Sequence, residues 1–77
     1  MTFEHIVSTP GILGGKPCIR GTRISVEVVL EFIANGATIQ QIVENYPQLS
    51  EEAVREAVLY AAYSLRNDVW FDIDVAA

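Results

Sequence analysis

Residues 38–65 read TIQQIVENYPQLSEEAVREAVLYAAYSL and decide the expected fold. Thr38 followed three residues later by Gln41 is a capping box, so a helix is expected to begin here. Pro47 cannot continue a helix and disfavours helical backbone just before it, so this helix is short. Ser50 followed by two acids indicates another helix start, because a hydroxyl caps free N–H groups and carboxylates favour the positive end of the helix dipole. The stretch therefore predicts a short helix, a tight connection and a longer helix.

The longer helix has two different faces. Apolar residues at spacings of three and four form a stripe that is expected to face the core. This stripe comprises Val54, Ala57, Val58, Ala61, Ala62 and Leu65. Leu59 and Tyr63 lie on the opposite face among charged residues, which indicates a second buried interface. The alternative is that they are isolated apolar residues on the surface, which are common.

The residues before this stretch predict a further helix and a short β segment. Ser25 is a suitable N-cap, and Gly36 suits the left-handed position that follows a helix end. Upstream, short segments at 18–20 and 22–24 are candidate strands separated by Gly21. We expect a mostly α fold, a three-helix bundle with a short N-terminal β-hairpin or arm.

The short helix, tight connection and longer helix match a helix-turn-helix, although any small three-helix bundle gives the same pattern. The alternative is a helical corner that only builds a core. The first turns of the longer helix favour this alternative, because recognition helices present Arg, Lys, Asn or Gln to bases. Here Glu51, Glu52 and Glu56 surround Arg55, which we keep as a candidate DNA contact.

Basic residues gather in residues 14–24, GGKPCIRGTRI. The chain has a net charge of −5, made up of +2 over residues 1–25 and −7 over residues 26–77. Lys16, Arg20 and Arg23 are therefore the candidate phosphate or DNA contacts, in a loop whose glycines allow close backbone approach. The same side chains could instead pair with acids on the chain's own helices, and both interpretations stay open.

Catalysis and cofactor chemistry find little support in the sequence. His5 is the single histidine and is expected to be solvated, and no base near Cys18 in sequence activates its thiol, so we expect a small buried structural cysteine. One His and one Cys do not make a zinc site. We predict a protein that is not an enzyme, with no catalytic residues, metal or cofactor.

The composition favours a homodimer in the cytoplasm. A 77-residue chain has a marginal core of its own, yet 51% of its residues are hydrophobic. A single cysteine excludes an intramolecular disulfide and fits a reducing compartment. No apolar run approaches the roughly 20 residues of a membrane span, and the N-terminus lacks the pattern of a signal peptide.

Two ordered stretches, GGKPCIRGTRISV and EFIANGATIQQIVENYPQLSEEAVREAVLYAAY, resemble the domain of unknown function family 433 over about residues 4–66. The resemblance implies a homeodomain-like or winged helix-turn-helix bundle at residues 1–66. Members are small bacterial and archaeal proteins that are often encoded beside a PIN-like nuclease and are regarded as antitoxins of the VapB kind. Residues 67–77 form an acidic-aromatic C-terminal tail outside the resemblance.

Two functions follow as hypotheses. The first is an antitoxin of a type II toxin–antitoxin pair that binds and neutralises a PIN-like nuclease, and that also binds its own operator DNA. The alternative is a stand-alone DNA-binding transcriptional regulator, which the acidic start of the longer helix disfavours. In the first hypothesis the tail binds the nuclease through Trp70, Phe71, Asp72, Ile73 and Asp74. Alternatively, the tail is a strand that pairs with the N-terminal arm.

Overall fold

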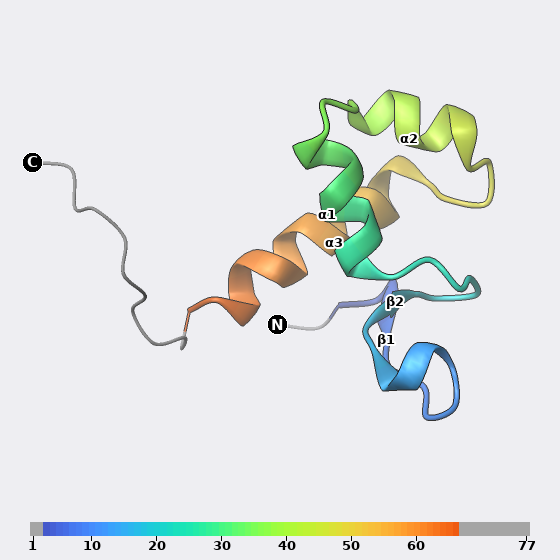
Figure 1. The fold of residues 1–77 in the computed structure, drawn as a ribbon, viewed down its shortest axis with the longest axis vertical. Coiled ribbons are helices and arrows are strands. Elements are labelled where there is room, and N and C mark those ends of the chain that lie inside the picture. Colours follow the sequence, from blue (N-terminus) through green and yellow to red (C-terminus); the bar gives the residue numbers. More distant parts are fainter. Residues whose placement is uncertain (1–2, 67–77) are drawn as a thin grey trace, which may run out of the picture.

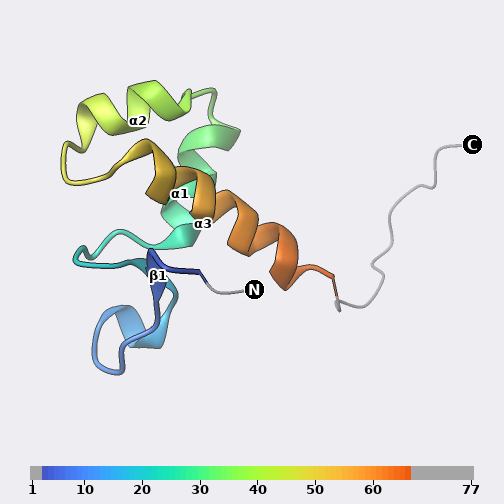
Figure 2. The ribbon, with the colours of Figure 1, turned by 180° about the vertical axis from the view of Figure 1, so that it is seen from behind.

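The computed structural model describes residues 3–66 of the 77-residue chain. The elements are, in order, β1 (Ile6–Val7), the 3-10 helix η1 (Leu13–Gly15), β2 (Cys18–Ile19), α1 (Val26–Ala34), α2 (Ile39–Asn45) and α3 (Glu51–Ser64). In Figures 1 and 2, α2 lies over the start of α3, α1 crosses α3, and the β1–β2 hairpin lies beyond α1. The predicted mostly helical fold with three helices and a short hairpin is confirmed for this part of the chain. None of its helices is long and apolar enough to cross a membrane.

The hairpin places the first described residues beside the basic loop. β1 and β2 are antiparallel, with Ile6 opposite Ile19 and Val7 opposite Cys18. The predicted strand at residues 22–24 is wrong, because the chain turns there. Gly21 has φ +80°, and the Thr22 hydroxyl donates to the Ile19 carbonyl while it accepts from the backbone N–H two residues later.

The predicted helix starts and the first helix end are confirmed by their hydrogen bonds. The hydroxyls of Ser25 and Ser50 accept from backbone N–H groups three residues later. Thr38 and Gln41 make both hydrogen bonds of the capping box. Gly36, with φ +97°, follows the last turn of α1 in a conformation that side-chain-bearing residues rarely adopt. Local signals therefore determine where each helix begins.

The core lies where the three helices meet the hairpin. Its largest fully buried side chains are Ile42 of α2, Leu49 of the α2–α3 connection, Val29 of α1 and Val54 of α3. Ile19 of β2 joins the same cluster. The short connection after α2 thus contributes to packing as well as to the turn.

The predicted core stripe of α3 is correct only for its first half. Ala53, Val54 and Ala57 are buried, whereas Val58 is 37% and Leu65 is 63% exposed. In Figure 1 the last turns of α3 project beyond α1 and α2, although Tyr60 and Ala61 still pack against the core. Apolar side chains of this half are consequently left on the surface.

Candidate functional site

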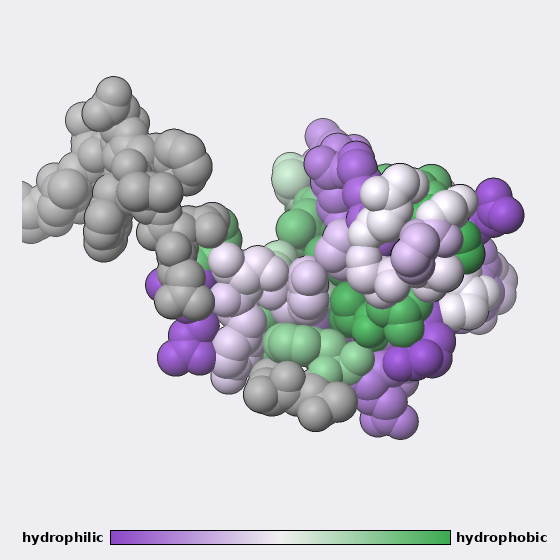
Figure 3. Space-filling view, turned by 90° about the horizontal axis from the view of Figure 1, so that it is seen from below, coloured by the Kyte–Doolittle hydropathy of each residue, from purple (hydrophilic) through white to green (hydrophobic). Residues whose placement is uncertain are grey.

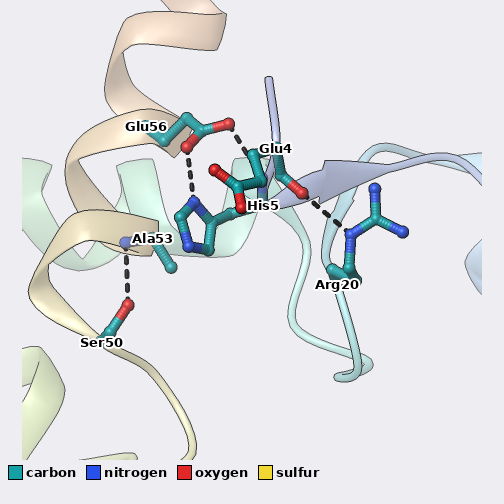
Figure 4. A network of polar contacts seen from close by, with 6 residues as sticks. All are labelled: Glu4, His5, Arg20, Ser50, Ala53 and Glu56. Carbon is teal, nitrogen blue, oxygen red and sulfur yellow. Dashed lines mark hydrogen bonds and ion pairs between the residues drawn. The ribbon is translucent and has the colours of Figure 1, made fainter. Parts of the chain in front are cut away.

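The three cations of the loop do not converge on one binding surface. Lys16 reaches α1, where its Nζ lies 3.0 Å from Oε1 of Glu27. This hydrogen bond and the charge of Glu27 raise the pKa of Lys16. Arg20 turns toward the N-terminal segment, and its Nε donates to the backbone carbonyl of Glu4 at 2.8 Å (Figure 4). The interpretation in which these residues pair with acids on the chain's own helices therefore holds for Lys16, whereas Arg20 is held by a backbone carbonyl.

Arg23 differs from the other two cations. Its side chain is exposed beside a shallow hollow lined by Val7, Thr9, Ile12 and Cys18. Within residues 3–66 it makes neither an ion pair nor a side-chain hydrogen bond. Of the loop cations, Arg23 is the one whose charge has no partner among the described residues.

Arg55 on α3 is also close to an acid of its own helix. One of its terminal nitrogens lies 3.8 Å from Oε2 of Glu51, four residues earlier. Both side chains are more than half exposed, so the pair is worth little in stability. Glu52 is exposed beside it, and the start of α3 thus presents mainly negative charge.

The structure separates the roles of Leu59 and Tyr63. Leu59 is 40% exposed, as expected for a residue available to a partner. Tyr63 is half-buried, because its ring meets that of Phe3 edge-to-face with centroids 5.7 Å apart. The guanidinium of Arg66 lies 4.8 Å from the Tyr63 ring centroid. Tyr63 thus already contacts the N-terminal segment within its own chain.

His5 is the largest correction to the sequence-based prediction. Its Nδ1 lies 2.6 Å from Oε2 of Glu56, and its backbone N–H donates to Oε1 of the same carboxylate at 2.9 Å (Figure 4). The predicted solvated histidine is wrong, because this pair fixes the arm to α3. No spacing rule could have found it, since the two residues are 51 positions apart. Cys18, by contrast, is buried as predicted.

An apolar groove, which no sequence pattern indicated, lies between the start of α1 and the last turns of α3. Its volume is about 440 Å³. It is lined chiefly by Pro17, Val26, Leu30, Tyr60, Ala61 and Leu65, with Lys16 and Glu27 at its rim. We call it the α1–α3 groove. It exists because α3 runs on past the helices that cover its first half.

Apolar side chains also reach another face of the molecule. In Figure 3, hydrophobic residues gather in the middle of the view and hydrophilic residues surround them. Among residues 3–66, no group of three or more His, Cys, Asp or Glu side chains is placed to hold a metal ion. The candidate site that this part of the chain offers is a binding surface, built from the groove and the exposed side of α3.

The predicted tail contacts, Trp70, Phe71, Asp72, Ile73 and Asp74, lie outside the described residues.

Comparison with known proteins covers much of the part that is described. A family model for "Protein of unknown function (DUF433)" matches residues 6–61. This chain belongs to the DUF433 family. The match spans the hairpin, α1, α2 and most of α3, so DUF433 is the unit that forms the site.

Two relatives of this DUF433 chain extend the comparison. A crystal structure of a DUF433 member protein from Anabaena variabilis ATCC 29413 has a TM-score of 0.74 and 36% identity, covering 77% of this chain and 58% of that one. The uncharacterized protein y4eO of Sinorhizobium fredii (strain NBRC 101917 / NGR234) is 41% identical over 58 residues, which are 75% of this chain and 26% of y4eO. The chain thus spans only about a quarter of y4eO. Neither name states an activity for the DUF433 unit.

Proposed function

We propose that this DUF433 protein is a protein-binding antitoxin of the VapB kind that forms a homodimer and neutralises a PIN-like nuclease in the cytoplasm. The observation that carries the proposal is the partly uncovered C-terminal half of α3, with the α1–α3 groove on one side and Leu59 on another. Exposed apolar surface of this kind is typical of a protein interface. The resemblance to the antitoxin-like family supplies the kind of partner.

Charge placement supports a protein partner ahead of DNA. Lys16 and Arg20 already contact groups of their own chain, and Arg55 lies beside Glu51. A DNA reader would have to break or share these contacts near a duplex that repels the acidic start of α3. A protein interface through α3 leaves these contacts intact and brings no duplex near the acidic start of the helix.

The homodimer is assigned to the exposed side of α3. Val58 and Leu59 are large apolar side chains of α3 that are exposed outside the α1–α3 groove. Sedimentation equilibrium at micromolar concentration tests the dimer, and Leu59→Glu together with Val58→Glu should convert it to a monomer. A wild-type chain that sediments as a monomer would overturn this part of the proposal and leave these residues for another partner.

Nuclease binding is assigned to the tail and tested by truncation after Arg66. Aromatic side chains interleaved with acids suit a basic, metal-bearing nuclease cleft. The buried core lies within residues 18–57, so the truncation removes none of it. Co-expressed with a PIN-like nuclease encoded next to it, the full chain should restore growth and the truncated chain should not. Protection by a truncated, folded chain would remove the tail from the mechanism.

Operator binding is a second candidate function, favoured by two observations. The order of a short α2, a five-residue connection and a longer α3 fits a helix-turn-helix, and Arg23 is exposed without an acidic partner among residues 3–66. In this version the loop contacts the phosphate backbone. A mobility-shift assay with DNA from upstream of the chain's own reading frame tests it, with an unrelated duplex as control.

A further inference from the structure

The α1–α3 groove is a specific place on the molecule that lacks an occupant among residues 3–66. Tyr60 and Ala61 of α3 and Leu30 of α1 are each half-buried, so part of every one of these side chains faces the groove. Its walls are almost entirely apolar, and its rim carries the exposed Lys16 and Glu27. A segment that filled it would need large apolar side chains and a few charged ones.

The chain itself supplies such a segment directly beside the groove. Leu65 forms part of the wall and is the C-cap residue that follows α3, so the chain leaves the helix at the groove's edge. After Arg66, eleven residues follow, Asn67 and then DVWFDIDVAA. Five residues beyond Leu65, an extended chain has moved roughly 17 Å at about 3.4 Å per residue. Trp70 is therefore within reach of the whole groove.

The chemistry of residues 67–77 matches the groove. Trp70, Phe71 and Ile73 are large and apolar, as the walls require. Their neighbours Asp72 and Asp74 can face Lys16, which is 61% exposed at the rim. From this juxtaposition we infer that, in the free protein, residues 67–77 dock into the α1–α3 groove of their own chain, with Trp70 between Leu30 and Leu65.

The same chain is a better occupant than a second copy because of its tether. A short covalent link gives the tail an effective concentration in the millimolar range, far above micromolar protein. The docked tail covers apolar surface that α3 leaves open, and a nuclease that takes the tail must first displace it. This inference concerns the protein alone, so its test needs no nuclease and its failure leaves the proposed neutralisation standing.

Trp70 is the chain's single tryptophan, so its fluorescence reports on the tail alone. Relative to a synthetic peptide of residues 67–77, we expect a blue-shifted emission maximum. We also expect roughly threefold weaker acrylamide quenching, as for a docked state populated about two-thirds of the time. Both differences should stay constant across a dilution series in which light scattering reports the oligomeric state.

Groove variants separate docking from other causes. Leu65→Glu places a charge in the wall at a side chain that is 63% exposed in the described fold, so folding should be preserved and quenching should rise to that of the peptide. Val28→Glu is the control, because Val28 is a 37% exposed apolar side chain of α1 outside both the groove and the proposed dimer face, and it should leave quenching unchanged. Lys16→Gln should give an intermediate value.

Three results would overturn the inference. The first is wild-type Trp70 quenched as strongly as the peptide. The second is equal quenching in Leu65→Glu and the wild type, which would place Trp70 in some other site. The third is a reduced acrylamide quenching of Trp70 that is lost on dilution together with the dimer. This result would assign the tail to the groove of a second copy.

Discussion

Nδ1 of His5 lies 2.6 Å from Oε2 of Glu56, and the two residues are 51 positions apart in the chain. The side chain of Glu56 is only 15% exposed and that of His5 is 31% exposed, so solvent reaches the pair partly. Together with the backbone N–H of His5, this contact attaches the β1 arm to the middle of α3.

The pair makes stability depend on pH. The hydrogen bond to Glu56 is the main cause that raises the pKa of His5 above 6.5, and nearby Glu4 and Glu52 add to it. The same bond lowers the pKa of Glu56 below 4.5, with a small contribution from Arg20. Stability from a raised histidine is complete below its unfolded pKa and is lost as pH rises through the folded pKa. Stability from a lowered carboxylate is complete above its unfolded pKa and is lost as pH falls through the folded pKa.

The contribution of the pair is therefore expected to be largest between the two unfolded values and to decline above and below that window. Urea unfolding at pH 5.5 and pH 8 checks this, with the wild type more stable at the lower value. Glu56→Gln should remove most of the difference between the two pH values. An unchanged difference in that variant would assign the pH dependence to other groups.

Leu49→Ala and Leu59→Ala are the same substitution in opposite environments. Leu49 is 2% exposed in the core, so its truncation should lower the free energy of unfolding by about 2–5 kcal/mol. Leu59 is 40% exposed, and its truncation should change that free energy by less than about 0.5 kcal/mol. Chemical denaturation at low protein concentration measures both. A large loss at Leu59 that grows with protein concentration would mean that it is buried between subunits.

Gly36→Ala should destabilise the junction between α1 and α2. Gly36 has φ +97°, and an L-residue held in left-handed backbone costs about 1–2 kcal/mol. Gly36→Asn is the control, because asparagine tolerates left-handed backbone better than alanine and should reduce the stability less. Equal losses in thermal unfolding for both variants would point to a cause other than backbone conformation.

Arg23→Ala tests the proposed DNA contact. If Arg23 neutralises one phosphate, its removal should reduce the slope of log K against log salt by about 0.9. Arg20→Ala should have a smaller effect, because that side chain is held by the Glu4 carbonyl. Fluorescence anisotropy with the upstream duplex measures both slopes. An unchanged slope for Arg23→Ala combined with lost binding for Arg55→Ala would make α3 the contact instead.

The sequence predicted those features of the fold that depend on neighbouring residues. Ser25, Thr38 and Ser50 cap helices as expected, because capping involves only the next three residues. The prediction that Val58 and Leu65 face the core is wrong, because periodicity identifies one face of a helix and not how far other helices cover that face. Where α1 and α2 end relative to α3 is a property of the assembled bundle.

For the candidate site, the sequence indicated which charged residues are present but not what they contact. Lys16 and Arg20 stood out as cations, but whether a cation pairs with Glu27 or remains available depends on how the loop folds back on the helices. The α1–α3 groove combines residues of the loop, α1 and α3, none of which is unusual in its local sequence. Its presence follows from packing geometry alone.

The edge-to-face contacts of the Phe3 ring with Tyr60 and Tyr63 have a consequence for biosynthesis. A ribosome synthesises Phe3 and His5 first and the residues that hold them more than fifty positions later. The contacts of the arm with α3 therefore cannot form until nearly the whole domain has left the exit tunnel. During translation β1 can pair with β2, and the arm reaches its final position only after α3 has emerged.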